Sequence, residues 1–454
     1  MNAMKRLIAC CAVTLSAGLA LATPEISLTE TVQAGPNKVN VSYVLAGSPA
    51  LVTVTFETNC VVGSETVWAP IGKGIVQTLV GDVNRVVQPG ARAFTWKARK
   101  DWPDREFASG SVRAVVKARR LSDPPEFAVI DLEKSEDAIS YYETKDELPG
   151  GIADDAYKTT KLLLRRIRAA NVRWKMGANY TDGSWDGKTV AQRPHMVSLS
   201  QDYYIGVYEF TQRQYELVAG FEGSTISNAK PSANTKDLVN ADKRPLTNVS
   251  YETLRGSGAD YVWPQKGHDV SPTLCFGLLR ARYGFQFDLP TCAQWEYAYR
   301  AGTDTAFFTG DEYSTSSNTR MKDYAWMLSN TTEDDDVDYS ASAVANQPRT
   351  HVVGKKLPNP WDLYDIAGNA AEICLDWAIS TDNAPSLEET VDPVGPTARS
   401  EVETYMFSRI WRGGSCVGGG MMGADGEHRA TAVYTWNGTY NCMGFRICCP
   451  AVAH

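Results

Sequence analysis

Two carboxylates in one irregular stretch are the residues whose spacing most directly suggests chemistry. Asp365 and Glu372 lie within residues 359–377, which are rich in turn formers and aromatics and have neither helical nor strand periodicity. If the loop curls at Gly368, both carboxylates converge, and they repel each other unless one is protonated or a cation lies between them. The backbone carbonyls of Gly368 and Ala370 can complete an oxygen shell. The spacing therefore predicts a calcium site made by Asp365, Gly368, Ala370 and Glu372.

A simpler alternative for this stretch is an ordinary turn at Asn369 with two carboxylates at the surface. A second acidic segment is the run Glu-Asp-Asp-Asp-Val-Asp at 333–338. Such runs are usually solvated loops, and a second cation site is the less favoured hypothesis for it.

The chain opens with a predicted targeting segment. A basic pair at positions 5 and 6 precedes an apolar run, and Ala-Leu-Ala at 20–22 has the pattern of a cleavage site. Residues 1–22 are therefore predicted to be a signal peptide, and the mature protein is expected to be secreted or periplasmic. Residues 7–10 formally fit a lipoprotein box, which is less favoured because no apolar run precedes it.

Removal of residues 1–22 leaves eight cysteines, and in an oxidising compartment some of them should form disulfides. Zinc is the alternative, but the sequence has no Cys-x-x-Cys pair and its five histidines are scattered. The sequence does not define the pairing of the eight, which are Cys60, Cys275, Cys292, Cys374, Cys416, Cys442, Cys448 and Cys449.

The elements that must position these residues divide the chain into three parts. Residues 23–120 show short alternating runs between turns, which predicts an antiparallel immunoglobulin-like β-sandwich. Residues 121–158 are rich in breakers and mainly polar from 133 to 155, with one candidate strand at 127–132, and are predicted to be a linker. Residues 159–454 combine short strands with helices, two of them opened by capping boxes that begin at Thr211 and Thr291, which predicts an α+β domain.

Composition limits the partners. The formal net charge is −8 and no basic stripe is evident, which argues against nucleic acid. Hydrophobic residues make up 43% and charged residues 22%, as is ordinary for a globular protein. Beyond residues 1–22, no stretch is apolar enough for membrane insertion.

Six ordered motifs resemble those of the sulfatase-modifying factor (formylglycine-generating enzyme) superfamily. The central one is Asn-Pro-Trp-x-Leu-Tyr-Asp-x-x-Gly-Asn-x-x-Glu, which carries the predicted calcium ligands. The others occupy residues 205–215, 244–250, 289–298, 411–415 and 443–446. The resemblance implies a C-type-lectin-like fold with calcium at the central motif, and a further calcium site near Asn330 or Asn346.

Active members of that superfamily oxidise a cysteine of a client sulfatase to formylglycine. They use two cysteines that lie three and eight residues beyond the serine of a Gly-Gly-Ser motif, and such a thiol pair can bind cuprous ion. Here the serine is Ser415 and the two positions are Gly418 and Gly423, so copper is not expected. Cys416 follows the serine directly and is interpreted as structural. Further departures from the pattern occur at Cys292, Asp362 and Ile373.

Other enzyme chemistries are less favoured. Carbon–sulfur bond formation in this superfamily needs a histidine cluster on a fused helical domain, and the chain has no His-x-x-x-His pair. A hydrolase built on Ser415 and His428 is less favoured than a turn serine and a surface histidine.

Residues 417–440 combine glycines with Tyr434, Trp436 and Tyr440, which suits either a recognition face or the packing of the last β-ribbon. We therefore expect an exported, non-catalytic protein that binds an extracytoplasmic protein, peptide or glycan. The alternative is an atypical formylglycine-generating or related oxidoreductase that acts on exported sulfatases.

Overall fold

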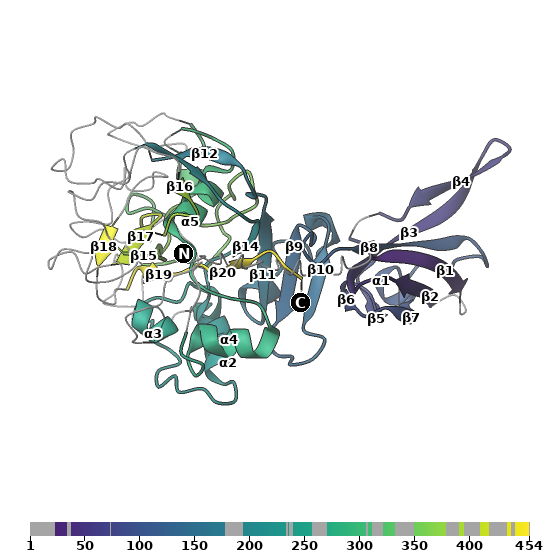
Figure 1. Ribbon diagram of the computed structural model, residues 1–454, viewed down its shortest axis with the longest axis horizontal. Helices are drawn as coiled ribbons and strands as arrows, with labels where there is room; N and C mark the ends of the chain where they lie inside the picture. Colours follow the sequence, from purple (N-terminus) through teal and green to yellow (C-terminus); the bar gives the residue numbers. More distant parts are fainter. Residues whose placement is uncertain are drawn as a thin grey trace, which may run out of the picture.

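The computed structural model describes residues 23–33, 38–72, 74–177, 194–232, 235, 239–256, 270–305, 307–310, 321–331, 349–377, 390–394, 409–416, 434–436 and 441–453. These residues include short helices and many short strands in several sheets (Figure 1). The mixture agrees with the expected α+β class.

The first part of the chain forms two antiparallel sheets around one apolar core. Its elements are β1 (Glu25–Gln33), β2 (Val39–Ala46), β3 (Ala50–Val62), β4 (Glu65–Pro70), β5 (Leu79–Gly81), β6 (Arg85–Val87), β7 (Gly90–Trp96), α1 (Ala98–Asp101) and β8 (Val112–Arg119). One sheet has the order β1-β2-β7-β5, and the other has the order β4-β3-β6 with β8 paired to β3.

Alternation explains the core of this part. In β2 the four residues Val39, Val41, Tyr43 and Leu45 are buried, and their neighbours face outward. They share one cluster with Phe56, Phe94 and Trp96 from the other strands. The β3–β4 hairpin runs beyond this body (Figure 1). The described part of residues 23–120 is therefore mainly β-structure with one short helix, and its assignment to the immunoglobulin type stays a prediction.

A five-stranded antiparallel sheet follows, in the order β10-β9-β11-β14-β20 (Figure 1). Its strands are β9 (Phe127–Asp131), β10 (Ile139–Tyr142), β11 (Lys161–Ile167), β14 (Tyr203–Gly206) and β20 (Cys448–Pro450). Residues 121–158, which we expected to connect two domains, thus supply two strands of this sheet. β9 is buried at four of its five positions, so this segment is part of the core.

Three helices pack against this sheet in one apolar cluster: α2 (Gln212–Ala219), α3 (Tyr251–Arg255) and α4 (Cys275–Tyr283). A fourth helix, α5 (Cys292–Arg300), belongs to a second cluster. Both predicted capping boxes are present. Thr211 and Gln214 exchange hydrogen bonds of 3.0 and 3.3 Å, and Thr291 and Gln294 exchange bonds of 3.0 and 3.1 Å.

The second cluster joins α5 to a four-stranded sheet of order β18-β17-β15-β19. These strands are β15 (Ala371–Trp377), β17 (Arg409–Arg412), β18 (Tyr434–Trp436) and β19 (Met443–Gly444). A three-stranded sheet is made by β12 (Arg173–Met176), β13 (His195–Ser198) and β16 (Thr390–Val391). Short 3-10 helices are η1 (Lys145–Glu147), η2 (Asp155–Lys158), η4 (Ala241–Lys243) and η5 (Met321–Asp323). In the part of the chain described, no helix has the length and apolar character needed to cross a membrane.

Candidate functional site

The loop before β15 is anchored to α5 by its first motif residue. The side-chain Nδ2 of Asn359 donates to the carbonyls of Ala298 and Tyr299, at 2.8 and 3.2 Å. Its Oδ1 accepts from the backbone N–H groups of Trp361 and Leu363. The last carbonyls of a helix lack partners within the helix, so Asn359 both completes the end of α5 and fixes the loop to it.

The centre of the loop requires a left-handed backbone. Gly368 has a φ of +79°, and a β-carbon there would lie 2.2 Å from the carbonyl oxygen of Trp326. Asn369 follows with a φ of 58° and is completely buried. Its Oδ1 accepts from the His351 N–H at 2.7 Å, and its Nδ2 donates to Glu209 Oε2 at 2.6 Å. The predicted turn is therefore present, but its asparagine is a buried cross-link rather than a surface residue.

Asp365 is buried with only one of its two oxygens satisfied. Oδ2 accepts from the Gly354 N–H at 2.6 Å. Oδ1 is buried and has no hydrogen-bond partner among the described residues, which is a costly arrangement for a carboxylate. Burial raises the pKa of Asp365 to about 6, with a further contribution from Glu372, although the Gly354 bond and the Arg446 guanidinium oppose the rise.

Glu372, the second predicted ligand, lies in β15 and pairs with an arginine. Its Oε1 accepts from Arg446 Nη2 at 2.8 Å and from Arg446 Nε at 3.0 Å. Its Oε2 accepts from Trp295 Nε1 at 2.7 Å. The other terminal nitrogen of Arg446, Nη1, donates to the carbonyls of Gly206 and Val207. This buried pair therefore connects β15 with the end of β14.

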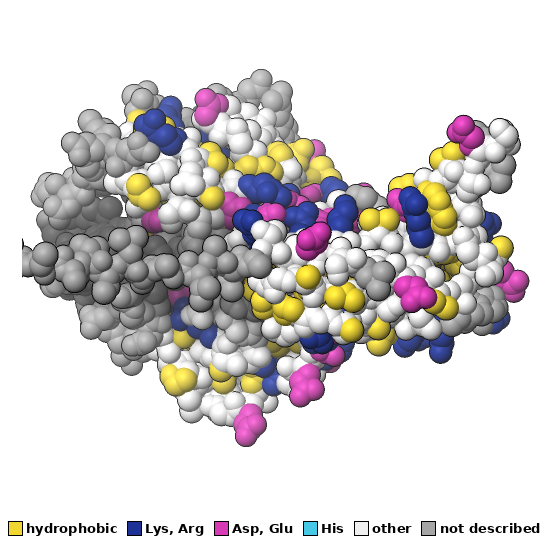
Figure 2. Space-filling model, turned by 45° about the vertical axis from the view of Figure 1, so that its right-hand side comes forward, with side chains coloured by type: hydrophobic (Ala, Val, Ile, Leu, Met, Phe, Trp, Pro, Cys, Tyr) yellow, Lys and Arg dark blue, Asp and Glu magenta, His cyan; other side chains and the backbone are white. Residues whose placement is uncertain are grey.

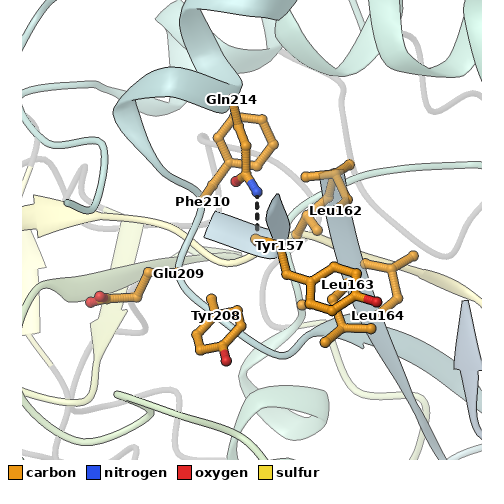
Figure 3. Close-up of a pocket in the computed structure, with 10 residues that line it drawn as sticks. Tyr157, Leu162, Leu163, Leu164, Tyr208, Glu209, Phe210 and Gln214 are labelled. Carbon is orange, nitrogen blue, oxygen red and sulfur yellow. Dashed lines mark hydrogen bonds between the residues drawn. The ribbon is translucent and has the colours of Figure 1, made fainter. Parts of the chain in front are cut away.

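A third buried carboxylate, Glu209, lies close to these two and was missed at the sequence level. It is completely buried, and its oxygens accept from the Ala370 N–H at 2.8 Å and from Asn369. Figure 3 shows its carboxylate extending away from the leucines that line a small cavity of about 10 Å³, the size of one water molecule. Burial first, and then Asp365 and Glu372, raise the pKa of Glu209 well above its ordinary value.

These contacts bear on the predicted calcium site in opposite ways. All four predicted residues, Asp365, Gly368, Ala370 and Glu372, lie in one buried segment. The unpaired oxygen of Asp365, with two further carboxylates and one guanidinium close by, fits a cation. However, the Glu372 carboxylate faces Arg446 and Trp295. Within the described ranges, no group of three or more His, Cys, Asp or Glu side chains is arranged to hold a metal ion. Calcium binding therefore stays a prediction.

Of the candidates for a second cation site, only Asn330 lies among the described residues. Asn330 is buried, and its Oδ1 accepts from the Met327 N–H at 2.7 Å while its Nδ2 donates to the Ala325 carbonyl at 3.0 Å. Both ends of its amide therefore hold the local turn. The acidic run 333–338 and Asn346 lie outside the described residues.

The described cysteines are buried thiols, none of them in a disulfide: Cys275, Cys292, Cys374, Cys416, Cys442, Cys448 and Cys449. Burial raises the pKa of Cys275, Cys416 and Cys449, which disfavours the reactive thiolate. The N–H of Cys416 donates to the Asn369 carbonyl at 3.0 Å, so this residue supports the central loop. The side chain of Cys60 and positions 418 and 423 lie outside the described part of the chain.

The sequence model described as the sulfatase-modifying factor enzyme 1-like domain matches residues 168–449, more than half of the chain. This chain belongs to that family. The match contains all six motifs and the whole cluster of buried carboxylates. Strands β9, β10 and β11 precede it, so they extend the sulfatase-modifying-factor domain on its N-terminal side.

Parts of this chain are similar in sequence to proteins that are named for two different roles. The Chaperone protein LppX of Paenibacillus barcinonensis is 29% identical over 195 residues, which is 40% of this chain and 64% of the relative. A formylglycine-generating enzyme of Thermomonospora curvata is 32% identical over 131 residues, 28% of this chain and 37% of the enzyme. The chain thus spans less than two thirds of either relative. The solved structure of Treponema denticola variable protein 1 aligns with a TM-score of 0.42 and 26% identity, covering 64% of this chain and 96% of that one.

Proposed function

We propose that this member of the sulfatase-modifying factor family is an exported, non-catalytic binding protein. The observation that carries the proposal is the pair Gly418 and Gly423, at the two positions where active members place the oxidase cysteines. Neither glycine can bind copper or activate dioxygen. The seven described cysteines are buried, so none of them offers an exposed thiol in place of the lost pair.

The central loop has the character of a support rather than of a reaction centre. Asn359, Asn369 and Glu372 direct their polar atoms to other parts of the protein, and the described hydrogen bonds fix the loop to α5 and β14. A rigid base of this kind suits the display of a binding surface on neighbouring loops. Residues 417–440, with Tyr434 and Trp436, are the part of the sequence that we propose for recognition.

The proposed partner is an extracytoplasmic protein, peptide or glycan. A relative named as a chaperone supports a protein or peptide, because chaperones bind other chains. Nucleic acid is disfavoured by the net charge of −8. Basic and acidic side chains are also interspersed on the face drawn in Figure 2. Export rests on the predicted signal peptide at residues 1–22.

Calcium is proposed as a structural ion of the central loop, and no role is proposed for copper. Asp365 and Glu372 would supply carboxylate oxygens, and Gly368 and Ala370 backbone carbonyls. The unpaired Oδ1 of Asp365 supports this proposal. Such an ion would balance buried negative charge and would stabilise the folded loop without taking part in a reaction.

The decisive experiment is an oxidase assay. Purified mature protein is incubated with copper, oxygen and a Cys-x-Pro-x-Arg peptide, beside the formylglycine-generating enzyme of Thermomonospora curvata as a positive control. We expect mass spectrometry to find the peptide cysteine unchanged. Conversion of the thiol to an aldehyde by this protein would replace the proposal with the alternative, an atypical oxidoreductase acting on exported sulfatases.

Binding is tested separately on peptide and glycan arrays with the same mature protein. The matched variant Trp436→Ala should lose the ligands that the unmodified protein retains. If the variant retains every ligand, the hypothesis that residues 417–440 bind the partner is wrong.

A further inference from the structure

Two buried thiols meet where α5 begins beside β15. Cys292 is the first residue of α5 and is 3% exposed, and Cys374 lies within β15 and is completely buried. Both belong to the same apolar cluster.

Two hydrogen bonds hold the two segments side by side next to the thiols. The N–H of Cys292 donates to Asp376 Oδ2 at 2.7 Å, and the N–H of Leu375 donates to the Pro290 carbonyl at 3.0 Å. Pro290 and Cys292 on one segment thus meet Leu375 and Asp376 on the other, directly after Cys374. The two segments therefore cannot slide past each other without breaking buried hydrogen bonds.

The side chains extend this arrangement. After burial, interaction with the Cys292 side chain is the largest cause that raises the pKa of the Cys374 thiol, so the two side chains lie close together. The guanidinium of Arg412, which is 1% exposed, also lies near the Cys292 side chain, and this interaction raises the pKa of Arg412 against the effect of burial. Two neighbouring thiols on segments fixed by buried hydrogen bonds satisfy the main geometric need of a disulfide, which is that the backbones already lie close together.

We infer that Cys292 and Cys374 are an oxidation site that closes to a disulfide when the chain meets a disulfide oxidant. The oxidant is a small disulfide such as oxidised glutathione, or an oxidoreductase that carries one. One thiolate attacks the oxidant to form a mixed disulfide and releases the first reduced thiol. The second cysteine then attacks the mixed disulfide and releases the other. Both protein sulfurs lose their protons, one S–S bond forms, and the oxidant leaves as two thiols.

The burial of the two thiols determines at which stage the disulfide can form. Because both thiols are shielded from solvent, exchange takes place while α5 docks on β15 or during opening of that contact, and not at the surface of the folded protein. The bond encloses the central loop, including Asn359 and Asp365, between its two ends. It would therefore constrain the unfolded chain over the whole segment that carries the buried carboxylates.

The test refolds the mature protein in a buffer of oxidised and reduced glutathione, without any assumption about export or ligand. The product is denatured in the presence of N-ethylmaleimide and digested without reductant. We expect a linked peptide that contains Cys292 and Cys374 and disappears on treatment with dithiothreitol. We also expect dithiothreitol to lower the Tm of the refolded protein.

Two variants test whether the effect of dithiothreitol on the Tm comes from the Cys292–Cys374 bond. Cys374→Ala should abolish the dependence of the Tm on dithiothreitol. Cys275→Ala, which removes an equally buried thiol in the other apolar cluster, should retain that dependence. Recovery of folded wild-type protein with both Cys292 and Cys374 alkylated, or with either of them linked to a different cysteine, would overturn the inference without the need of any variant.

Discussion

Replacement of Asp365 by asparagine removes the buried negative charge and leaves the size and shape of the side chain almost unchanged. The amide keeps an oxygen that can accept the Gly354 N–H. In the folded protein the pKa of Asp365 is about 6, compared with a reference value of 3.8, so the folded state binds more protons between these values. Stability therefore falls as the pH rises through this window. Above it, the ionised carboxylate costs about 3 kcal/mol, since one pKa unit corresponds to about 1.4 kcal/mol.

Calcium reverses this cost if the ion binds as proposed. With calcium removed by chelation at neutral pH, Asp365→Asn should be more stable than the wild type by up to about 3 kcal/mol, which for a domain of about 300 residues is a Tm difference of roughly 5 °C. Added calcium should stabilise the wild type by about 2.7 kcal/mol at a hundredfold excess over its Kd. The variant should not respond, because it lacks the carboxylate that the ion would neutralise.

The assay is thermal unfolding by circular dichroism, with and without calcium, for the wild type, Asp365→Asn and a control. Asp288→Asn is the matched control, because Asp288 is equally buried but is paired with Arg255 and Arg280. It should be destabilised with calcium and without it, since the change leaves buried arginines less well paired. Equal stability of the wild type and Asp365→Asn in chelator, together with an equal response to calcium, would refute the reasoning.

Gly368→Ala should destabilise the protein by roughly 4 kcal/mol in chemical unfolding, because the new methyl group meets the Trp326 carbonyl. Gly63→Ala, with a φ of +68° and open space around it, should cost only about 1–2 kcal/mol. Asp376→Asn should flatten the loss of stability that accompanies a rise in pH from about 4 to 6, because burial raises the pKa of Asp376 to about 6; an unchanged pH profile would contradict this. N-terminal sequencing of exported protein should begin at Thr23 without lipid, and acylation at position 10 would show that the cleavage site was misassigned.

Local signals were predictable from the sequence. The capping boxes at Thr211 and Thr291 were recognised because each is complete within four residues. The turn at Gly368 was recognised because glycine and asparagine favour a left-handed backbone. The family motifs predicted the domain that the comparison with known families found at residues 168–449.

Distant partners were not predictable. Glu209 accepts from Ala370, and Glu372 pairs with Arg446, across separations that no local pattern can show. The only available signal for Glu209 was an acidic residue in an otherwise apolar and aromatic run, Tyr-Ile-Gly-Val-Tyr-Glu-Phe. The sequence indicated one strand at 127–132, and β9 confirms it. Its pairing with β11 and the second strand of this segment, β10, were missed for a similar reason, because both depend on strand pairing rather than on a local pattern.

The order of the five-stranded sheet has a consequence for how the protein reaches its folded state. β9 and β20 belong to the same sheet although more than three hundred residues separate them in the sequence, and β14 pairs with residues 448–450. A chain that emerges from a ribosome or a translocation channel can form β9, β10 and β11 early, but one edge of β14 waits for β20. Contacts of such long sequence separation form slowly, and the unpaired edge is a site for association with other chains in the meantime. The folding of this domain should therefore be most vulnerable just before its last strand arrives, which is when assistance from a chaperone would matter most.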